Sequence, residues 1–230
     1  MKYIKQAMTI LGITTLLGGI PAAVYAQASQ PNVEKSPREK KSLQQFYNQG
    51  VQKLNQGNFN GAIEDFDSLL QLNPKYYEGY CLRALAKAQL QDFQAAVADY
   101  NQALKLNPRH VDAYNGRAMI NAELENFNAA AADFNQTIKI DPKFVDGYYN
   151  LGLLSYRQGN NKQAIAHFNQ ALKINPKLAD AYGNRGLAQY ALGDKPSAVA
   201  DLQLAANLFQ QQGNTEGYQQ TQALIQQFQQ

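Results

Sequence analysis

The sequence predicts an all-α solenoid of five helix–turn–helix units followed by a C-terminal capping helix. Prolines recur at a fixed interval of 34 residues, which is typical of stacked helix pairs. They stand at Pro74, Pro108, Pro142 and Pro176. Between them, apolar residues recur at helical spacing in two blocks per interval. One helix pair cannot bury its apolar face alone, so neighbouring pairs must stack.

The first segment, residues 1–26, is predicted to be a signal peptide. Lys2 and Lys5 precede an apolar stretch, Pro21 breaks that stretch, and small residues lead to Ala26. We expect cleavage after Ala26 and export to the periplasm or an equivalent lumen. The alternative is an uncleaved anchor in the inner membrane, because the segment approaches the ~20 residues that a spanning helix needs.

Residues 27–42 contain two prolines and a basic cluster without apolar periodicity. This composition predicts a flexible linker with solvated charges. The whole chain has 21 Lys and Arg against 18 Asp and Glu, and without Lys2 and Lys5 it is nearly neutral. A nucleic-acid partner is not expected, because its binding needs a concentrated basic patch.

The prolines also set the boundaries of the five units. The units are 43–76, 77–110, 111–144, 145–178 and 179–212. Asn or Asp precedes each proline and is expected to end the second helix, because the residue before proline is driven out of helical geometry. Another Asn or Asp ends the short turn inside each unit and is expected to cap the second helix. These residues are Asn58, Asp92, Asn126, Asn160 and Asp194.

Three further positions repeat in every unit. A small residue in the first helix allows close approach of the second: Gly50, Ala84, Ala118, Gly152 and Gly186. A second small residue lies early in the second helix: Ala62, Ala96, Ala130, Ala164 and Ala198. A bulky residue follows four positions later: Phe66, Tyr100, Phe134, Phe168 and Leu202. With the 34-residue period, this pattern resembles the tetratricopeptide repeat (TPR) family. The resemblance implies a right-handed superhelix in which the first helix of each unit lines a concave, peptide-binding face.

The last segment departs from the repeat. The fifth unit has Gln210 where a proline is expected, so its second helix should continue to about Gln212. Gly213 and Asn214 then break the chain, and residues 213–230 are expected to hold a helix that caps the solenoid.

The sequence offers little material for catalysis or metal binding. It has one cysteine and two histidines, and it contains no phosphate loop, zinc-binding or serine-hydrolase motif. We expect Cys81 to be a packed core residue, and His110 and His167 to be structural. The chain is therefore predicted to be no enzyme and to need no cofactor or metal.

Arginine recurs one position before the small residue of the first helix, and aspartate stands sixteen residues after it. The fourth unit loses both together. We therefore predict salt bridges between the two helices of a unit, with the pairs Arg83–Asp99, Arg117–Asp133 and Arg185–Asp201.

The resemblance also suggests which residues face the groove. The carboxylate clamp of chaperone-binding TPR proteins is absent, because the matching residues are Tyr47, Val51, Leu82, Asp112 and Gly116. The candidate groove residues are Tyr47, Asn115, Asp146, Tyr149, Asn150, Tyr156, Arg157, Asn184 and Tyr190. Acids run along their N-terminal edge at Glu78, Asp112, Asp146 and Asp180. Each acid could instead stabilise a helix dipole, and each tyrosine could serve inter-repeat packing.

This set favours a neutral or basic extended segment of another polypeptide. The leading hypothesis is an exported protein-interaction scaffold. The alternative is a membrane-anchored assembly factor for a membrane complex, which requires that the N-terminal segment is retained. Replacing Asn150 and Asn184 by alanine is expected to weaken binding with little effect on thermal stability.

Overall fold

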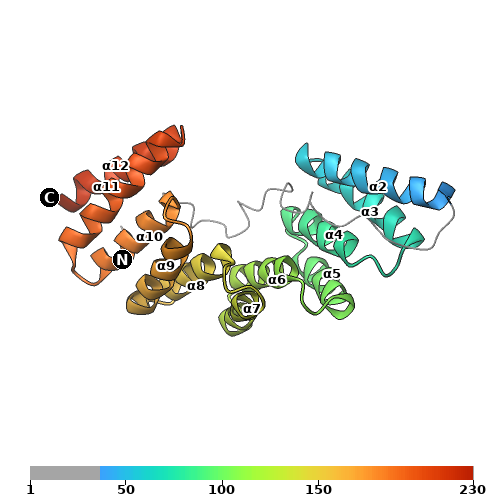
Figure 1. Ribbon diagram of the computed structural model, residues 1–230, viewed down its shortest axis with the longest axis horizontal. Coiled ribbons are helices and arrows are strands. Elements are labelled where there is room, and N and C mark those ends of the chain that lie inside the picture. Colours follow the sequence, from blue (N-terminus) through green and yellow to red (C-terminus); the bar gives the residue numbers. More distant parts are fainter. Residues whose placement is uncertain (1–36, 230) are drawn as a thin grey trace. The chain divides into compact units, whose positions relative to one another are not determined.

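The computed structural model describes residues 37–229, which form eleven α-helices and no strand (Figure 1). The helices are α2 (Pro37–Asn55), α3 (Phe59–Leu72), α4 (Tyr77–Gln89), α5 (Phe93–Leu106), α6 (Val111–Glu123), α7 (Phe127–Ile140), α8 (Val145–Arg157), α9 (Asn161–Ile174), α10 (Ala179–Ala191), α11 (Lys195–Gln211) and α12 (Thr215–Gln229). Even-numbered helices α2 to α10 are the first helices of the predicted units, odd-numbered helices are the second, and α12 is the predicted cap. The predicted signal peptide, 1–26, and residues 27–36 lie outside the described residues.

The described residues divide into two compact units, α2–α6 up to Leu124 and α7–α12 from Glu125. Within each unit, helices that follow one another in the chain contact one another (Figure 1). First helices also contact the next first helix, as α2 does with α4, and α8 with α10. The chain is therefore an α-solenoid, as the 34-residue period predicts.

Helix α2 begins earlier than the first predicted unit. It starts at Pro37, so residues 37–42 are helical and are not part of a linker. Proline suits the first helical turn, because its fixed φ matches the helix and its missing N–H has no intrahelical acceptor there. The linker prediction for residues 27–42 is wrong for this part.

Each proline turn is held by a side chain as well as by the proline. Asn73, just before Pro74, has an extended backbone with φ −136°, and its Oδ1 accepts from the amide of Lys75 at 3.3 Å. The same side-chain bond recurs in the next three turns, made by Asn107, Asp141 and Asn175. The residue before proline therefore both ends one helix and shapes the turn into the next.

The turn between the two helices of each 34-residue repeat contains a residue with a left-handed backbone. Glycine occupies this position in three units, for example Gly159 with φ +77°. The second and third units carry Gln91 (φ +61°) and Glu125 (φ +58°) at the equivalent position. A side chain disfavours this conformation, so these two turns are strained where the glycine turns are not.

Side-chain caps at the second helices are confirmed in three of the five units. Asn58, Asp92 and Asp194 accept an amide proton from the first turn, at 3.1 to 3.3 Å. Asn126 and Asn160 make no such bond. Both are exposed, so water can satisfy the first-turn amides that these side chains do not reach.

Small residues of the first helices face the bulky residues of the second, as predicted. A Cβ added to Gly50 would lie 2.5 Å from a ring carbon of Phe66, and one added to Gly152 would lie 2.5 Å from Phe168. Both rings are fully buried. The glycines therefore allow a helix approach that even alanine would obstruct.

The predicted salt bridges Arg83–Asp99 and Arg185–Asp201 are confirmed. Arg83 donates from Nε and Nη2 to the two carboxylate oxygens of Asp99, at 2.8 and 2.6 Å. Arg185 makes the same forked contact with Asp201, at 2.6 and 2.7 Å. Arg117 belongs to the compact unit that ends at Leu124 and Asp133 to the one that begins at Glu125, so this pair stays a prediction.

Each arginine also contacts a residue sixteen positions before it, in the second helix of the preceding repeat. Arg83 Nη1 lies 2.6 Å from Asp67 Oδ1, and Arg185 donates to Asn169 at 2.6 Å. Arg117 donates to Asn101 at 2.5 Å. One guanidinium thus joins the second helices of two successive repeats, so it fixes the stacking of repeats as well as the pairing inside one.

The two ends of the solenoid depart from the repeat pattern. At the first repeat, Lys53 Nζ lies 2.7 Å from Asp65 Oδ2 and takes the place of the absent arginine. At the last, α12 packs on α11 and buries Leu224, Ile225 and Phe228. The predicted capping helix is therefore present.

Candidate functional site

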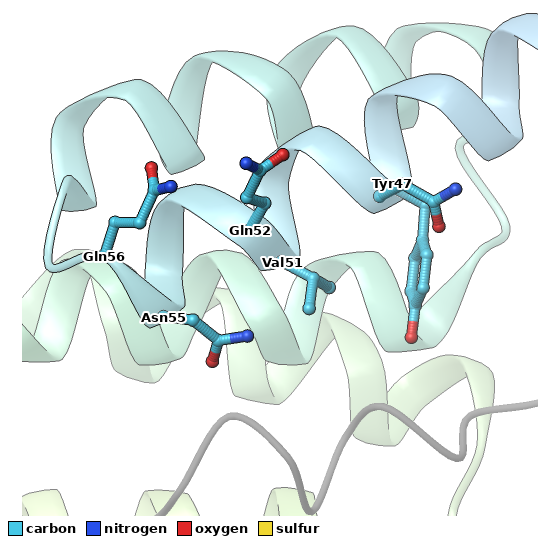
Figure 2. Close-up of a pocket in the computed structure, with 6 residues that line it drawn as sticks. Tyr47, Val51, Gln52, Asn55 and Gln56 are labelled. Carbon is cyan, nitrogen blue, oxygen red and sulfur yellow. The ribbon is translucent and has the colours of Figure 1, made fainter.

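A pocket lies on the exposed face of α2, in the unit α2–α6. Its volume is about 490 Å³. It is lined by Tyr47, Asn48, Val51, Gln52, Asn55 and Gln56. Figure 2 shows Tyr47, Val51 and Asn55 pointing to one side of the helix, while Gln52 and Gln56 project from the other. The pocket therefore combines partly buried apolar surface with exposed amide groups.

Tyr47 connects this pocket to the residue that precedes the next first helix, α4. Its ring packs edge-to-face against Tyr76, with ring centroids 6.3 Å apart. Burial, and then the charge of the Glu78 carboxylate, raise the pKa of Tyr47. The phenol therefore stays neutral at physiological pH.

Three of the four acids at the start of the first helices are partly or fully buried, whereas Asp146 is exposed. Glu78 in α4 is 4% exposed, and Tyr77 donates to its Oε1 at 3.3 Å. Burial raises the pKa of Asp112 in α6 and of Asp180 in α10. Burial of a carboxylate costs free energy, because it removes water from the charged form.

In the unit α7–α12, four of the groove and edge residues come together between α8 and α10. Asn184 in α10 donates from Nδ2 to the Tyr149 hydroxyl in α8 at 3.0 Å. Burial, and then the charges of Asp180 and Asp146, raise the pKa of Tyr149. Asp146 lies one helical turn before Tyr149 on α8, and Asp180 one turn before Asn184 on α10.

Asn184 itself is completely buried, and Asn150 is 6% exposed. This contradicts the expectation that alanine at both positions leaves thermal stability nearly unchanged. Removing Asn184 would delete its hydrogen bond to Tyr149, at a cost of about 1 kcal/mol.

The remaining predicted groove residues have other surroundings. Asn115 in α6 is buried and contacts the Met119 sulfur at 3.6 Å. Tyr156 is also buried, and burial raises its pKa to about 12. Arg157 lies over the Phe127 ring, with its guanidinium carbon 5.7 Å from the centroid.

Tyr190 is stacked on Phe228 of the capping helix, with ring centroids 3.6 Å apart and planes at 11°. Lys195 Nζ lies 5.9 Å from the centroid of the same ring. This tyrosine therefore takes part in packing between the fifth repeat and its cap.

The cysteine and the histidines have structural surroundings. Cys81 is fully buried in the core, and burial raises the pKa of its thiol. His110 caps α6, because its Nδ1 accepts from the amide of Ala113 at 3.1 Å. Burial lowers the pKa of both His110 and His167. These groups provide neither a thiolate nor an exposed general base.

No three His, Cys, Asp or Glu residues in residues 37–229 lie close enough together to hold a metal ion. In the same part of the chain, no helix has both the length and the apolar character needed to cross a membrane.

Sequence reasoning missed most of the α2 pocket. Asn48, Gln52, Asn55 and Gln56 were not among the predicted residues, although their three- and four-residue spacing places exposed amides together on a helix. It also gave no sign that Tyr149 and Asn184 touch, since they belong to different repeats.

Comparisons with known proteins agree on one family. Family models described as tetratricopeptide repeats match residues 82–148 and 134–166, and a model described as a TPR repeat matches residues 154–193. The search of curated proteins finds no match.

Solved structures show the same fold at low sequence identity. MamA from Desulfovibrio magneticus RS-1, from residue 41 to its end, is 19% identical, with a TM-score of 0.66 over 74% of this chain and 97% of that one. A thermophilic TPR protein of Thermus thermophilus is 18% identical, with a TM-score of 0.64 over 81% and 99%. YrrB, described as a TPR protein with an unusual peptide-binding site, is 16% identical, with a TM-score of 0.57 over 81% and 93%.

The 34-residue period, the paired helices and these matches lead to one assignment: the chain belongs to the tetratricopeptide repeat proteins.

Proposed function

We propose that this chain is an exported, non-enzymatic scaffold that binds a polypeptide partner in the groove lined by its first helices. The observation that carries the proposal is the α2 pocket, where Tyr47 and Val51 are flanked by exposed amides. An amide side chain both donates and accepts, so a row of them can pair with the N–H and C=O groups of an extended backbone.

The low-identity neighbour YrrB supports a peptide as the ligand, since its structure is described by its peptide-binding site. The surroundings of Cys81 and His110 favour a structural role over catalysis, because the thiol is fully buried with a raised pKa and the imidazole caps α6.

Export is part of the proposal and rests on the signal-like residues 1–26. The second candidate is a membrane-anchored assembly factor in which this segment is retained. N-terminal sequencing of the protein purified from its own cells separates the two. A mature terminus at Gln27 with release by osmotic shock supports export, and an intact Met1 in the membrane fraction supports the anchor.

The pocket is tested with paired amide-to-alanine variants of the full chain. One variant carries Gln52→Ala with Asn55→Ala, inside the pocket. The control carries Asn60→Ala with Gln71→Ala, two exposed amides of α3 outside it. Partners captured by the wild type are identified by mass spectrometry, and the affinity of a purified partner is then measured for each variant. We expect the pocket variant to bind at least about tenfold more weakly and the control to be unchanged. Equal binding by all three proteins would refute a role for the α2 pocket.

A further inference from the structure

Between α8 and α10 a buried acceptor lacks a donor. Asp146, Tyr149 and Asn184 present oxygen atoms, and the Asp180 carboxylate lies one turn from Asn184 on the same helix. Asn184 donates its Nδ2 to Tyr149, whereas its Oδ1 is buried and has no hydrogen-bond partner in the described chain. A buried acceptor left unsatisfied is rare in native structures and needs an explanation.

Asp180 presents the same imbalance in charge. It is partly buried, and within residues 37–229 it forms no ion pair with a lysine, arginine or histidine. The Tyr149 hydroxyl lies in the combined negative field of Asp180 and Asp146. A partly buried carboxylate costs free energy that a bound cation would recover.

We infer that the α8–α10 cluster of Asp146, Tyr149, Asp180 and Asn184 is a binding site for the ammonium or guanidinium group of a basic side chain. An ammonium group has three donors and no acceptor, which matches the carboxylates of Asp146 and Asp180 and the unsatisfied Oδ1 of Asn184. Asn184 positions the phenol, because its Nδ2 occupies one lone pair of that oxygen and leaves the other for the ligand. The inference rests on the proposed peptide-binding function and names the partner chemistry as a Lys or Arg side chain in the bound segment.

Other pairs of first helices in this chain provide internal comparisons. At α4–α6 the two acids are present as Glu78 and Asp112, but Cys81 and Gly116 stand where α8–α10 has the phenol and the amide. The complete set of acceptors is therefore particular to α8–α10 among these two pairs. Asp112→Asn is accordingly a matched control for Asp180→Asn.

The first test uses a small probe, so that it does not depend on peptide binding. The full chain, isotopically labelled, is titrated with n-butylammonium or with n-butanol and followed by NMR. We expect n-butylammonium to shift the Asn184 side-chain amide, and n-butanol to leave it in place. Asp180→Asn should weaken the n-butylammonium response by about tenfold, since a charge-assisted hydrogen bond is lost. Tyr149→Phe, which keeps the ring, should weaken it less, and Asp112→Asn should not change it.

Equal shifts with both probes, or a response that persists in Asp180→Asn, would overturn the inference. The spectrum of each variant also reports whether it is folded, so a lost response in a folded Asp180→Asn protein supports the site.

The second test separates this site from the groove function. Peptides acetyl-Ala-Ala-Lys-Ala-Ala-amide and the same sequence with norleucine for lysine are compared on the full chain. Tighter binding of the lysine peptide, lost in Asp180→Asn, supports the inference. Equal binding of both peptides refutes the cation site while leaving the groove function standing. A response to n-butylammonium without binding of either peptide supports the site and counts against the groove function.

Discussion

Replacing Arg83 by leucine should loosen the stacking of the first two repeats. Leucine is the residue that the fourth repeat carries at this position, so the substitution fits the fold. Arg83 joins Asp99 of its own repeat, which is 7% exposed, to Asp67 of the preceding repeat, which is 47% exposed. Its guanidinium also lies over the Tyr80 ring, 5.4 Å from the centroid.

The expected cost is about 2 kcal/mol. Breaking a fully buried pair costs about 3–5 kcal/mol, while an exposed pair contributes about 0–1 kcal/mol. The Asp99 contact belongs near the first class and the Asp67 contact to the second. Lys87 Nζ lies 2.7 Å from the same Asp99 carboxylate and remains in the variant, so the loss falls below the fully buried limit.

Amide hydrogen exchange measures this loss where it occurs, because stability in a solenoid is a sum of local and nearest-neighbour terms. About 2 kcal/mol corresponds to roughly 30-fold faster exchange in α3 to α5, with α10 and α11 unchanged as an internal reference. Asp67→Asn removes only the exposed partner of Arg83 and should change exchange by less than about threefold. If the exchange rates of α3 to α5 in Arg83→Leu stay within about threefold of the wild type, the contacts of Arg83 contribute no stability. A loss spread evenly over both units would equally refute the local account.

Three further outcomes can be checked. Gln91→Gly should raise the free energy of unfolding, measured with urea, by about 0.5–1 kcal/mol, because φ +61° suits glycine. Gly159→Ala should lower it by a similar amount, and opposite signs would mean that these turns carry no strain. The free energy of unfolding should decrease as the pH drops below about 6.5. Burial lowers the pKa of His110, so the unfolded imidazole binds more protons there than the folded one. His110→Asn, which keeps a capping side chain, should flatten this fall between pH 7.5 and 5 and leave only the part due to His167; an unchanged slope would assign the effect elsewhere. Gly152→Ala should destabilise by about 1–3 kcal/mol, because its Cβ would lie 2.5 Å from the facing ring, and an unchanged melting temperature would show that the ring moves aside at no cost.

The repeat boundaries were predictable because local chemistry determines them. The helices α4, α6, α8 and α10 begin at residues 77, 111, 145 and 179, the first residues of their predicted units. Each boundary depends on an Asn-Pro or Asp-Pro step, whose geometry is set by the residues themselves. The early start of α2 was missed because residues 37–42 lack an apolar pattern, and only the proline at position 37 suggests a helix start.

The long-range contacts were predictable only in part. The Arg83–Asp99 pair was found because both charges change together from repeat to repeat. The second contact, sixteen residues before each arginine, was missed because its acceptor is a carboxylate in Asp67 but an amide in Asn101 and Asn169. A search for charge pairs finds the first and overlooks the other two.

The burial of Asn184 depends on a neighbour in another repeat. Helical periodicity places Asn184 on the same face as Asn150, one repeat before it, but it does not say that the Tyr149 phenol occupies the space in front of the amide. The side chain at the position of Tyr149 is Tyr47, Cys81, Asn115 and Gly183 in the other repeats, so no period predicts it.

Residues that serve folding recur every 34 positions in this chain, so residues that do not recur are candidates for binding. The buried aromatic ring and the small residue that faces it recur from the first repeat to the fourth because every repeat must stack. Tyr149 and Asn184 do not recur in every repeat: Cys81, Asn115 and Gly183 stand at the position of Tyr149, and Leu82 and Gly116 at that of Asn184, so stacking alone does not require these two residues. Substitutions at positions that recur should therefore unfold repeats, whereas Asp180→Asn or Tyr149→Phe should affect the ligand first.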